Sequence, residues 1–317
     1  MGRQTLSFVL RGGISLALLA LLPLLGFVDL GRTTQLIVGA DPPFLLLAVA
    51  LLTGDRFLMA AKWRLLLQAR DVALPLGSAA RAYYVASFAG LFLPMTVGAD
   101  VVRTFAVAPR FRTPTLVASI ILERALGALS QALLATCAAF LLAHLAGVPL
   151  GALGWGLSAV ILLAGLACPL SFRVARWFTR WPVRSPLMAK LQGWAQVYLE
   201  YSTQRGVLIL FLLLSLVEGL FPVAIHYAAG RALGLQASLA LYMATIPIVF
   251  LIARIPVSLG GIGVVESSFV VLAGRIGLGA TEAFALALLA EVLLLISLLP
   301  GALFALQPIP AHSEGKP

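Results

Sequence analysis

PMTVGADVVR at residues 94–103 and PVSLGGIGVVE at residues 256–266 are closely similar motifs in strongly apolar parts of the chain. Each has a proline, a hydroxyl residue two positions later, a glycine four positions later, a Val-Val pair and then a charged residue. Proline and glycine interrupt helices, and a membrane tolerates interrupted backbone only where protein or a wet cavity satisfies the freed polar groups. The doubled break therefore predicts an internally repeated membrane protein with a polar site between its halves, which favours transport over chemistry.

Composition supports the membrane assignment. The 317 residues are 61% hydrophobic and only 11% charged, whereas soluble domains are about 25% charged. We therefore predict an all-α polytopic membrane protein, with residues 1–306 as a single integral membrane domain and 307–317 as a disordered tail. The net charge of +10 comes from Lys and Arg in short segments beside apolar runs. This placement is typical of cytoplasmic loops and not of nucleic-acid binding.

Apolar runs of spanning length, about 20 residues, occur at 12–30, 42–64, 114–146, 150–171, 206–229 and 281–306. Two further apolar regions, 76–110 and 237–277, contain the breaks. Arg3 and Arg11 precede the first run, and no cleavage site follows it, so we expect an uncleaved first helix with a cytoplasmic N-terminus. The prediction is about six full spans plus two broken helical hairpins.

Basic residues also constrain the topology. The segment 171–205 is rich in Arg and is predicted as a cytoplasmic loop, or as an interfacial helix on anionic inner-leaflet phospholipids. Arg103, Arg110 and Arg112 make both ends of 76–110 cytoplasmic, so this region would be a re-entrant hairpin. The same reasoning places the hairpin 237–277 on the opposite face. Pseudo-repeats 42–146 and 206–306 would then form an inverted repeat, as in many transporters. Residues 237–253 are long enough to cross alone, which leaves an eight-span alternative open.

Charged residues in apolar runs are the best candidates for function, because each costs about 2.5–3.5 kcal/mol on insertion scales. Asp100 and Arg103 follow the first break, and Arg254 and Glu266 flank the second. A helix restarting at either break presents free N–H groups and its positive dipole end, and the arginines add charge suited to a phosphate. The alternative is that Asp100 and Glu266 only cap restarted helices. Because the break occurs twice, we favour an anionic headgroup site.

Glu123 and Arg124 are adjacent in the run 114–146. Neighbouring helical residues point about 100° apart, so each needs a partner elsewhere, and the hairpin charges are the nearest candidates. Two hypotheses stay open. The charges form a structural ion pair between hairpin and span, or Glu123 or Glu266 takes up protons during transport.

The segments FLPMTVGADVVR at 92–103, Glu123-Arg124 and IPVSLGGIGVVE at 255–266, with KWRLLL at 62–67, resemble the lysylphosphatidylglycerol synthase transmembrane (flippase-like, formerly UPF0104) family. The resemblance covers essentially the whole chain. It implies an inner-membrane protein related to the lipid-flipping half of multiple-peptide-resistance-factor proteins, with relatives associated with hopanoid synthesis or archaeal protein glycosylation. The motif departs from the family at Ala99, where glycine is common, and at Val265, where a basic residue often stands. The soluble aminoacyl-transferase domain has no counterpart, so we expect no lysyl transfer.

The leading hypothesis is an inner-membrane lipid translocase that moves an anionic or glycosylated lipid headgroup. Alternatives are a membrane enzyme or accessory subunit acting on a phospholipid- or polyprenyl-linked substrate, or a scaffold for a lipid-modifying enzyme partner. Since no catalytic or metal-ligating constellation occurs, we expect neither enzyme activity nor a cofactor. The predicted substrate-binding residues are Pro94, Gly98, Asp100, Arg103, Glu123, Arg124, Arg254, Pro256, Gly260, Gly261, Gly263 and Glu266.

Overall fold

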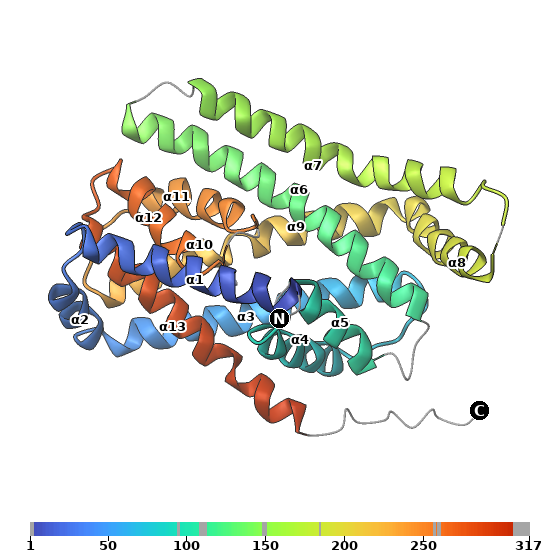
Figure 1. The fold of residues 1–317 in the computed structure, drawn as a ribbon, viewed down its shortest axis with the longest axis horizontal. Coiled ribbons are helices and arrows are strands. Elements are labelled where there is room, and N and C mark those ends of the chain that lie inside the picture. Colours follow the sequence, from blue (N-terminus) through green and yellow to red (C-terminus); the bar gives the residue numbers. More distant parts are fainter. Residues whose placement is uncertain are drawn as a thin grey trace. The chain divides into compact units, whose positions relative to one another are not determined.

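The computed structural model describes residues 3–93, 96–107, 113–147, 151–183, 185–255, 258 and 261–306. These residues form helices joined by short connections and contain no strand (Figure 1). The predicted all-α class is therefore confirmed. The tail 307–317 and three predicted site residues, Pro94, Pro256 and Gly260, lie outside the described residues.

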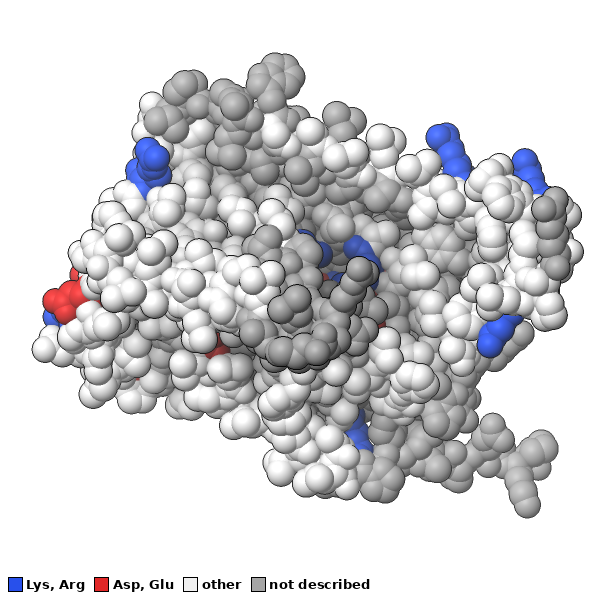
Figure 2. All heavy atoms as spheres, viewed as in Figure 1, with Lys and Arg blue, Asp and Glu red and all other residues white. Residues whose placement is uncertain are grey.

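Long apolar helices account for the predicted spans. Helices α3 (Pro42–Gln68), α6 (Thr113–Ala146) and α13 (Ala280–Ala305) coincide with three of them and are long and apolar enough to cross a membrane. Helix α1 (Arg3–Leu24) covers most of the first run, and α7 (Gly151–Phe178) covers the run 150–171. Few of the described side chains on the face shown in Figure 2 are Lys, Arg, Asp or Glu.

The predicted span 206–229 is divided into α9 (Arg205–Glu218) and α10 (Phe221–Ala232). Pro222 stands in the first turn of α10 and has no N–H to continue the ladder from Glu218, which explains an interruption that the sequence reading missed. The combined stretch Arg205–Ala232 is still long and apolar enough to span.

The segment 171–205 is mostly helical, and its predicted place on the cytoplasmic side, as a loop between spans or as an interfacial helix, stays a prediction. Helix α7 continues to Phe178, and α8 (Pro186–Glu200) and a 3₁₀ turn, η1 (Tyr201–Thr203), follow. Ser185 starts α8 as its N-cap, with its side chain accepting from the Met188 N–H at 3.2 Å. A further short helix, α2 (Leu30–Val38), is capped by Asp29 and was not predicted.

Both predicted breaks are present. Helices α4 (Leu76–Gly90) and α5 (Thr96–Val107) pack together on either side of the first, and α11 (Leu239–Ile252) and α12 (Val264–Gly274) on either side of the second. A Cβ at Gly98 would lie 2.8 Å from Cβ of Leu93, so the tight reversal into α5 requires glycine there. The second break contains Gly261 and Gly263 at φ +92° and +84°, a conformation that L side chains rarely adopt.

The chain forms two compact units. Unit 1 comprises Met1–Asp55, Ala125–Pro169 and Leu212–Ser297, and unit 2 comprises Arg56–Arg124, Leu170–Phe211 and Leu298–Pro317. The first break therefore belongs to unit 2 and the second to unit 1. The inverted relation of the two breaks stays a prediction.

Each unit has its own apolar core. In unit 1, helices α10 to α13 bury Val249, Phe269 and Leu286. In unit 2, helices α3, α4 and α6 bury Trp63, Leu67 and Leu116. The core of unit 2 adjoins a cluster of charged side chains, which is the unusual feature of this unit.

Candidate functional site

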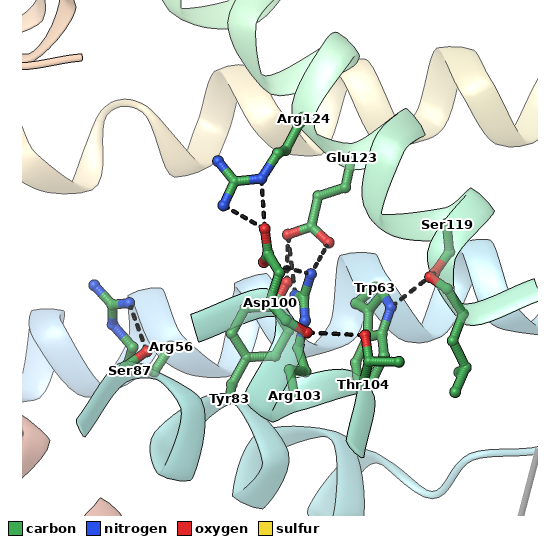
Figure 3. A network of polar contacts seen from close by, with 11 residues as sticks. Arg56, Trp63, Tyr83, Ser87, Asp100, Arg103, Thr104, Ser119, Glu123 and Arg124 are labelled. Atoms are coloured by element: carbon green, nitrogen blue, oxygen red, sulfur yellow. Dashed lines mark hydrogen bonds and ion pairs between the residues drawn. The ribbon is translucent and has the colours of Figure 1, made fainter. Parts of the chain in front are cut away.

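Four of the predicted site residues meet in unit 2 (Figure 3). Arg103 on α5 donates from Nη2 to Glu123 Oε2 at 2.9 Å and from Nη1 to Glu123 Oε1 at 3.2 Å. This two-pronged geometry is the strong form of an Arg–carboxylate pair. The guanidinium also lies 3.3 Å from Asp100 Oδ1. The expectation that Glu123 finds its partner among the hairpin charges is confirmed.

The Arg103 guanidinium is enclosed by aromatic rings. Its side chain is only 3% exposed, and Cζ lies 4.6 Å from the Trp63 ring centroid and 4.3 Å from that of Tyr83. Arginine stacks on aromatic faces in this way because the flat cation is weakly hydrated. The Tyr83 hydroxyl donates to Glu123 Oε1, and Trp63 Nε1 donates to Ser119 Oγ at 3.0 Å. Helices α3, α4, α5 and α6 thus hold Arg103 as a fixed cation.

Arg124 provides the second cation of this network. It pairs with Asp100 Oδ2, so Asp100 bridges two arginines that come from different helices. The Arg124 side chain is 48% exposed, in contrast to Arg103. The site therefore combines one enclosed guanidinium, that of Arg103, with one half-exposed guanidinium, that of Arg124.

The alternative that Asp100 and Glu266 cap the helices that restart after the breaks has a different outcome at each break. Asp100 lies on the second turn of α5, which begins at Thr96, and the partners of its carboxylate among the described residues are Arg103 and Arg124. Glu266 does cap: it is the third residue of α12, and Oε2 accepts from the Gly263 N–H at 2.7 Å. This is one half of a capping box, because Gly263 has no side chain to return the bond.

Glu266 has a second oxygen that the cap does not use. The side chain is 1% exposed, and Oε1 has no hydrogen-bond partner among the described residues. Ser258 Oγ, in the same break, is likewise buried without such a partner. Glu291 on α13 interacts electrostatically with Glu266. Arg254 is exposed just after α11. Two buried polar atoms of the second break, Glu266 Oε1 and Ser258 Oγ, thus have no hydrogen-bond partner among the described residues.

Glu266→Gln should fold about as stably as the wild type, because the amide oxygen can still accept from the Gly263 N–H. Glu266→Ala should lose about 1–3 kcal/mol of unfolding free energy, because that buried N–H is left without an acceptor. Unfolding of the two purified variants in SDS titrations measures the difference. Equal stability of the two variants would contradict the capping role.

Trp63 and Tyr83 contact the charged groups of the site but were not predicted from the sequence as site residues. Trp63 lies within the KWRLLL motif, and Tyr83 lies in the first hairpin, but neither position reveals which cation its ring contacts. Among the described residues, no group of three or more His, Cys, Asp or Glu side chains could hold a metal ion.

Long apolar helices, two interrupted helix pairs and charges gathered inside an apolar chain define a polytopic helical membrane protein. Residues 8–301 match the family model of the lysylphosphatidylglycerol synthase TM region, and the chain belongs to this family. Membership places it among membrane proteins of lipid metabolism or translocation. A comparison with curated proteins gives no significant match.

Proposed function

We propose that this protein is an inner-membrane lipid translocase that moves an anionic or glycosylated lipid headgroup and is not itself an enzyme. Its N-terminus would lie in the cytoplasm, as the basic residues predict. The observation that carries the proposal is the Asp100 bridge between an enclosed arginine and an exposed one, at a helix break in a protein of a lipid-handling family. Ionisable groups inside membrane segments are costly, and where they persist they are usually functional.

The bridge supplies a means of binding and release. Asp100 accepts hydrogen bonds from both Arg103 and Arg124. When Arg124 leaves Asp100 to bind a lipid phosphate, the Asp100 carboxylate still has Arg103 as its partner. Phosphate and carboxylate oxygens match the guanidinium fork equally well. The positive dipole end at the start of α5 adds attraction for an anion. The sequence-based hypothesis adds Arg254 and Glu266 of the second break to the same midplane site.

We expect three classes of partner: the transported lipid, anionic phospholipids of the inner leaflet, and a lipid-modifying enzyme that supplies or uses the lipid. The basic helical segment 171–205 supports the second, because each Lys or Arg near an anionic surface contributes about 1 kcal/mol.

Arg124→Gln should abolish most transport while leaving the fold intact, because its half-exposed ion pair contributes at most about 1 kcal/mol to stability. The assay reconstitutes the protein with fluorescent phosphatidylglycerol and measures how much label an impermeant quencher reaches. Arg275→Gln, which removes an exposed cation after α12, serves as the matched control and should transport normally. If label accessibility is the same with and without protein, the translocase proposal fails. Product formation from a phospholipid or polyprenyl donor would then favour the membrane-enzyme alternative.

A further inference from the structure

Unit 2 contains an apolar groove between the start of α6, the end of α7 and α8. Its volume is about 370 Å³, within the range of about 300–1,000 Å³ that small-molecule sites occupy. The lining is almost entirely aliphatic and aromatic, and its outer members are exposed. Representative lining residues are Val117, Ile121, Val174, Phe178, Leu191 and Ala195.

Specific contacts between α7 and α8 hold the groove in shape. The hydroxyls of Ser171 and Tyr198 lie 2.6 Å apart in a hydrogen bond, and the Phe172 and Tyr198 rings stack with centroids 4.8 Å apart. Buried Gln192 donates from Nε2 to the carbonyls of Phe178 at 3.0 Å and Trp181 at 2.8 Å. These bonds engage the polar side chains of Ser171, Gln192 and Tyr198 within α7 and α8, so the groove offers its occupant a mainly apolar surface.

The face of α6 that lines the groove also carries Arg124 of the charged network. Val117, Ile121 and Arg124 follow one another at i, i+4 and i+7 on α6 and therefore share a face. The position of Arg124 is three residues, or about 4.5 Å of helix rise, beyond that of Ile121, and its guanidinium is turned to Asp100 (Figure 3). An apolar groove with a half-exposed arginine beside it on the same helix face is complementary to a molecule with a long apolar chain and an anionic head.

We propose that this groove seats an acyl chain of an anionic phospholipid whose phosphate reaches Arg124. The inference rests on the proposed function, because it gives the transported lipid its docking position before the headgroup enters the network. Exposed Trp177 in the last turn of α7 and exposed Trp181 just after it fit this placement, since tryptophan is enriched at the membrane–water boundary.

Photolabelling tests the assignment. The full chain is placed in phosphatidylcholine nanodiscs with phosphatidylglycerol that carries a diazirine in one acyl chain, and labelled peptides are located by mass spectrometry. We expect labels on the groove-lining parts of α6, α7 and α8. Ala195→Trp fills the groove and should lower this labelling about tenfold. Excluding even two methylene groups of the acyl chain from the groove weakens binding by about that factor. Gln196→Trp adds the same ring on the exposed side of α8 and should label like the wild type.

The headgroup part is tested by a phosphatidylcholine probe with the same diazirine chain. It should label the groove several-fold less than phosphatidylglycerol in the wild type, and Arg124→Gln should remove the difference. Equal labelling by both probes, or cross-links between groove residues of two protein copies in place of lipid labels, would overturn the assignment. Groove labelling without transport would contradict the proposed function alone. If Ala195→Trp changes neither the labelling nor the transport, only the assignment of the groove as the acyl-chain site is contradicted.

Discussion

Arg103→Met is expected to lower the free energy of unfolding by about 3 kcal/mol or more, because it removes one partner of a buried ion pair. Of the partners that Glu123 has in the network, only the Tyr83 hydroxyl would remain, and the carboxylate would lie beside aromatic rings without a cation. Arg124→Gln, by contrast, should cost at most about 1 kcal/mol, because that side chain is half-exposed. SDS titration of the purified variants provides the measurement.

The double variant Arg103→Met/Glu123→Leu separates structure from function. Removing both charges leaves no unpaired ion, so most of the lost stability should return, with a coupling energy of about 2 kcal/mol or more in the double-mutant cycle. Transport should stay absent, because the enclosed cation is gone. Simple additivity of the two single effects would contradict the ion pair. Normal transport by the stable double variant would show that the pair is only structural.

Gly263→Ala is expected to lower the free energy of unfolding by about 2–5 kcal/mol, the combined cost of a left-handed backbone and of an overpacked contact. Gly263 has φ +84°, and a Cβ there would lie 2.7 Å from the carbonyl oxygen of Ser15 and 2.8 Å from Cβ of Leu18. The first of these atoms is backbone of α1, so a whole helix would have to move. Thermal unfolding in detergent gives the size of the loss.

Gly274→Ala is the matched control because it lies at the other end of α12. A Cβ at Gly274 meets nothing within 4 Å, and its φ is not in the left-handed region. The unfolding free energy of Gly274→Ala should differ from that of the wild type by no more than about 1 kcal/mol. A small increase is expected, because alanine has a better helix propensity than glycine. Should Gly263→Ala unfold at the same temperature as Gly274→Ala, the close packing of α12 on α1 would be refuted.

Local chemistry made much of this fold predictable. Proline and glycine marked both breaks, and the apolar runs marked the helices now seen as α3, α6 and α13. The pairing of Glu123 with a hairpin charge was also predictable, because its helical neighbour Arg124 points elsewhere. The sequence left two interpretations of Glu266 open, a helix cap and a residue of the headgroup site. A carboxylate in the first turn of a helix is compatible with both.

Other features depend on packing between distant segments. Which aromatic rings enclose Arg103 is decided by how α3 and α4 approach α5, and no spacing along the chain records it. The groove arises because Gln192 and Tyr198 fasten α8 to α7 through contacts that are 11 to 27 residues apart. The interruption between α9 and α10 had a local signal in Pro222, which a hydrophobicity count overlooks.

The most direct test of the translocase account is quencher accessibility of fluorescent phosphatidylglycerol in proteoliposomes that contain wild-type protein or Arg103→Met/Glu123→Leu. Lipid labelled in both leaflets should become almost fully accessible with the wild type and stay accessible only in the outer leaflet with the double variant. Outer-leaflet accessibility alone in both preparations, or full accessibility in both, would contradict the account.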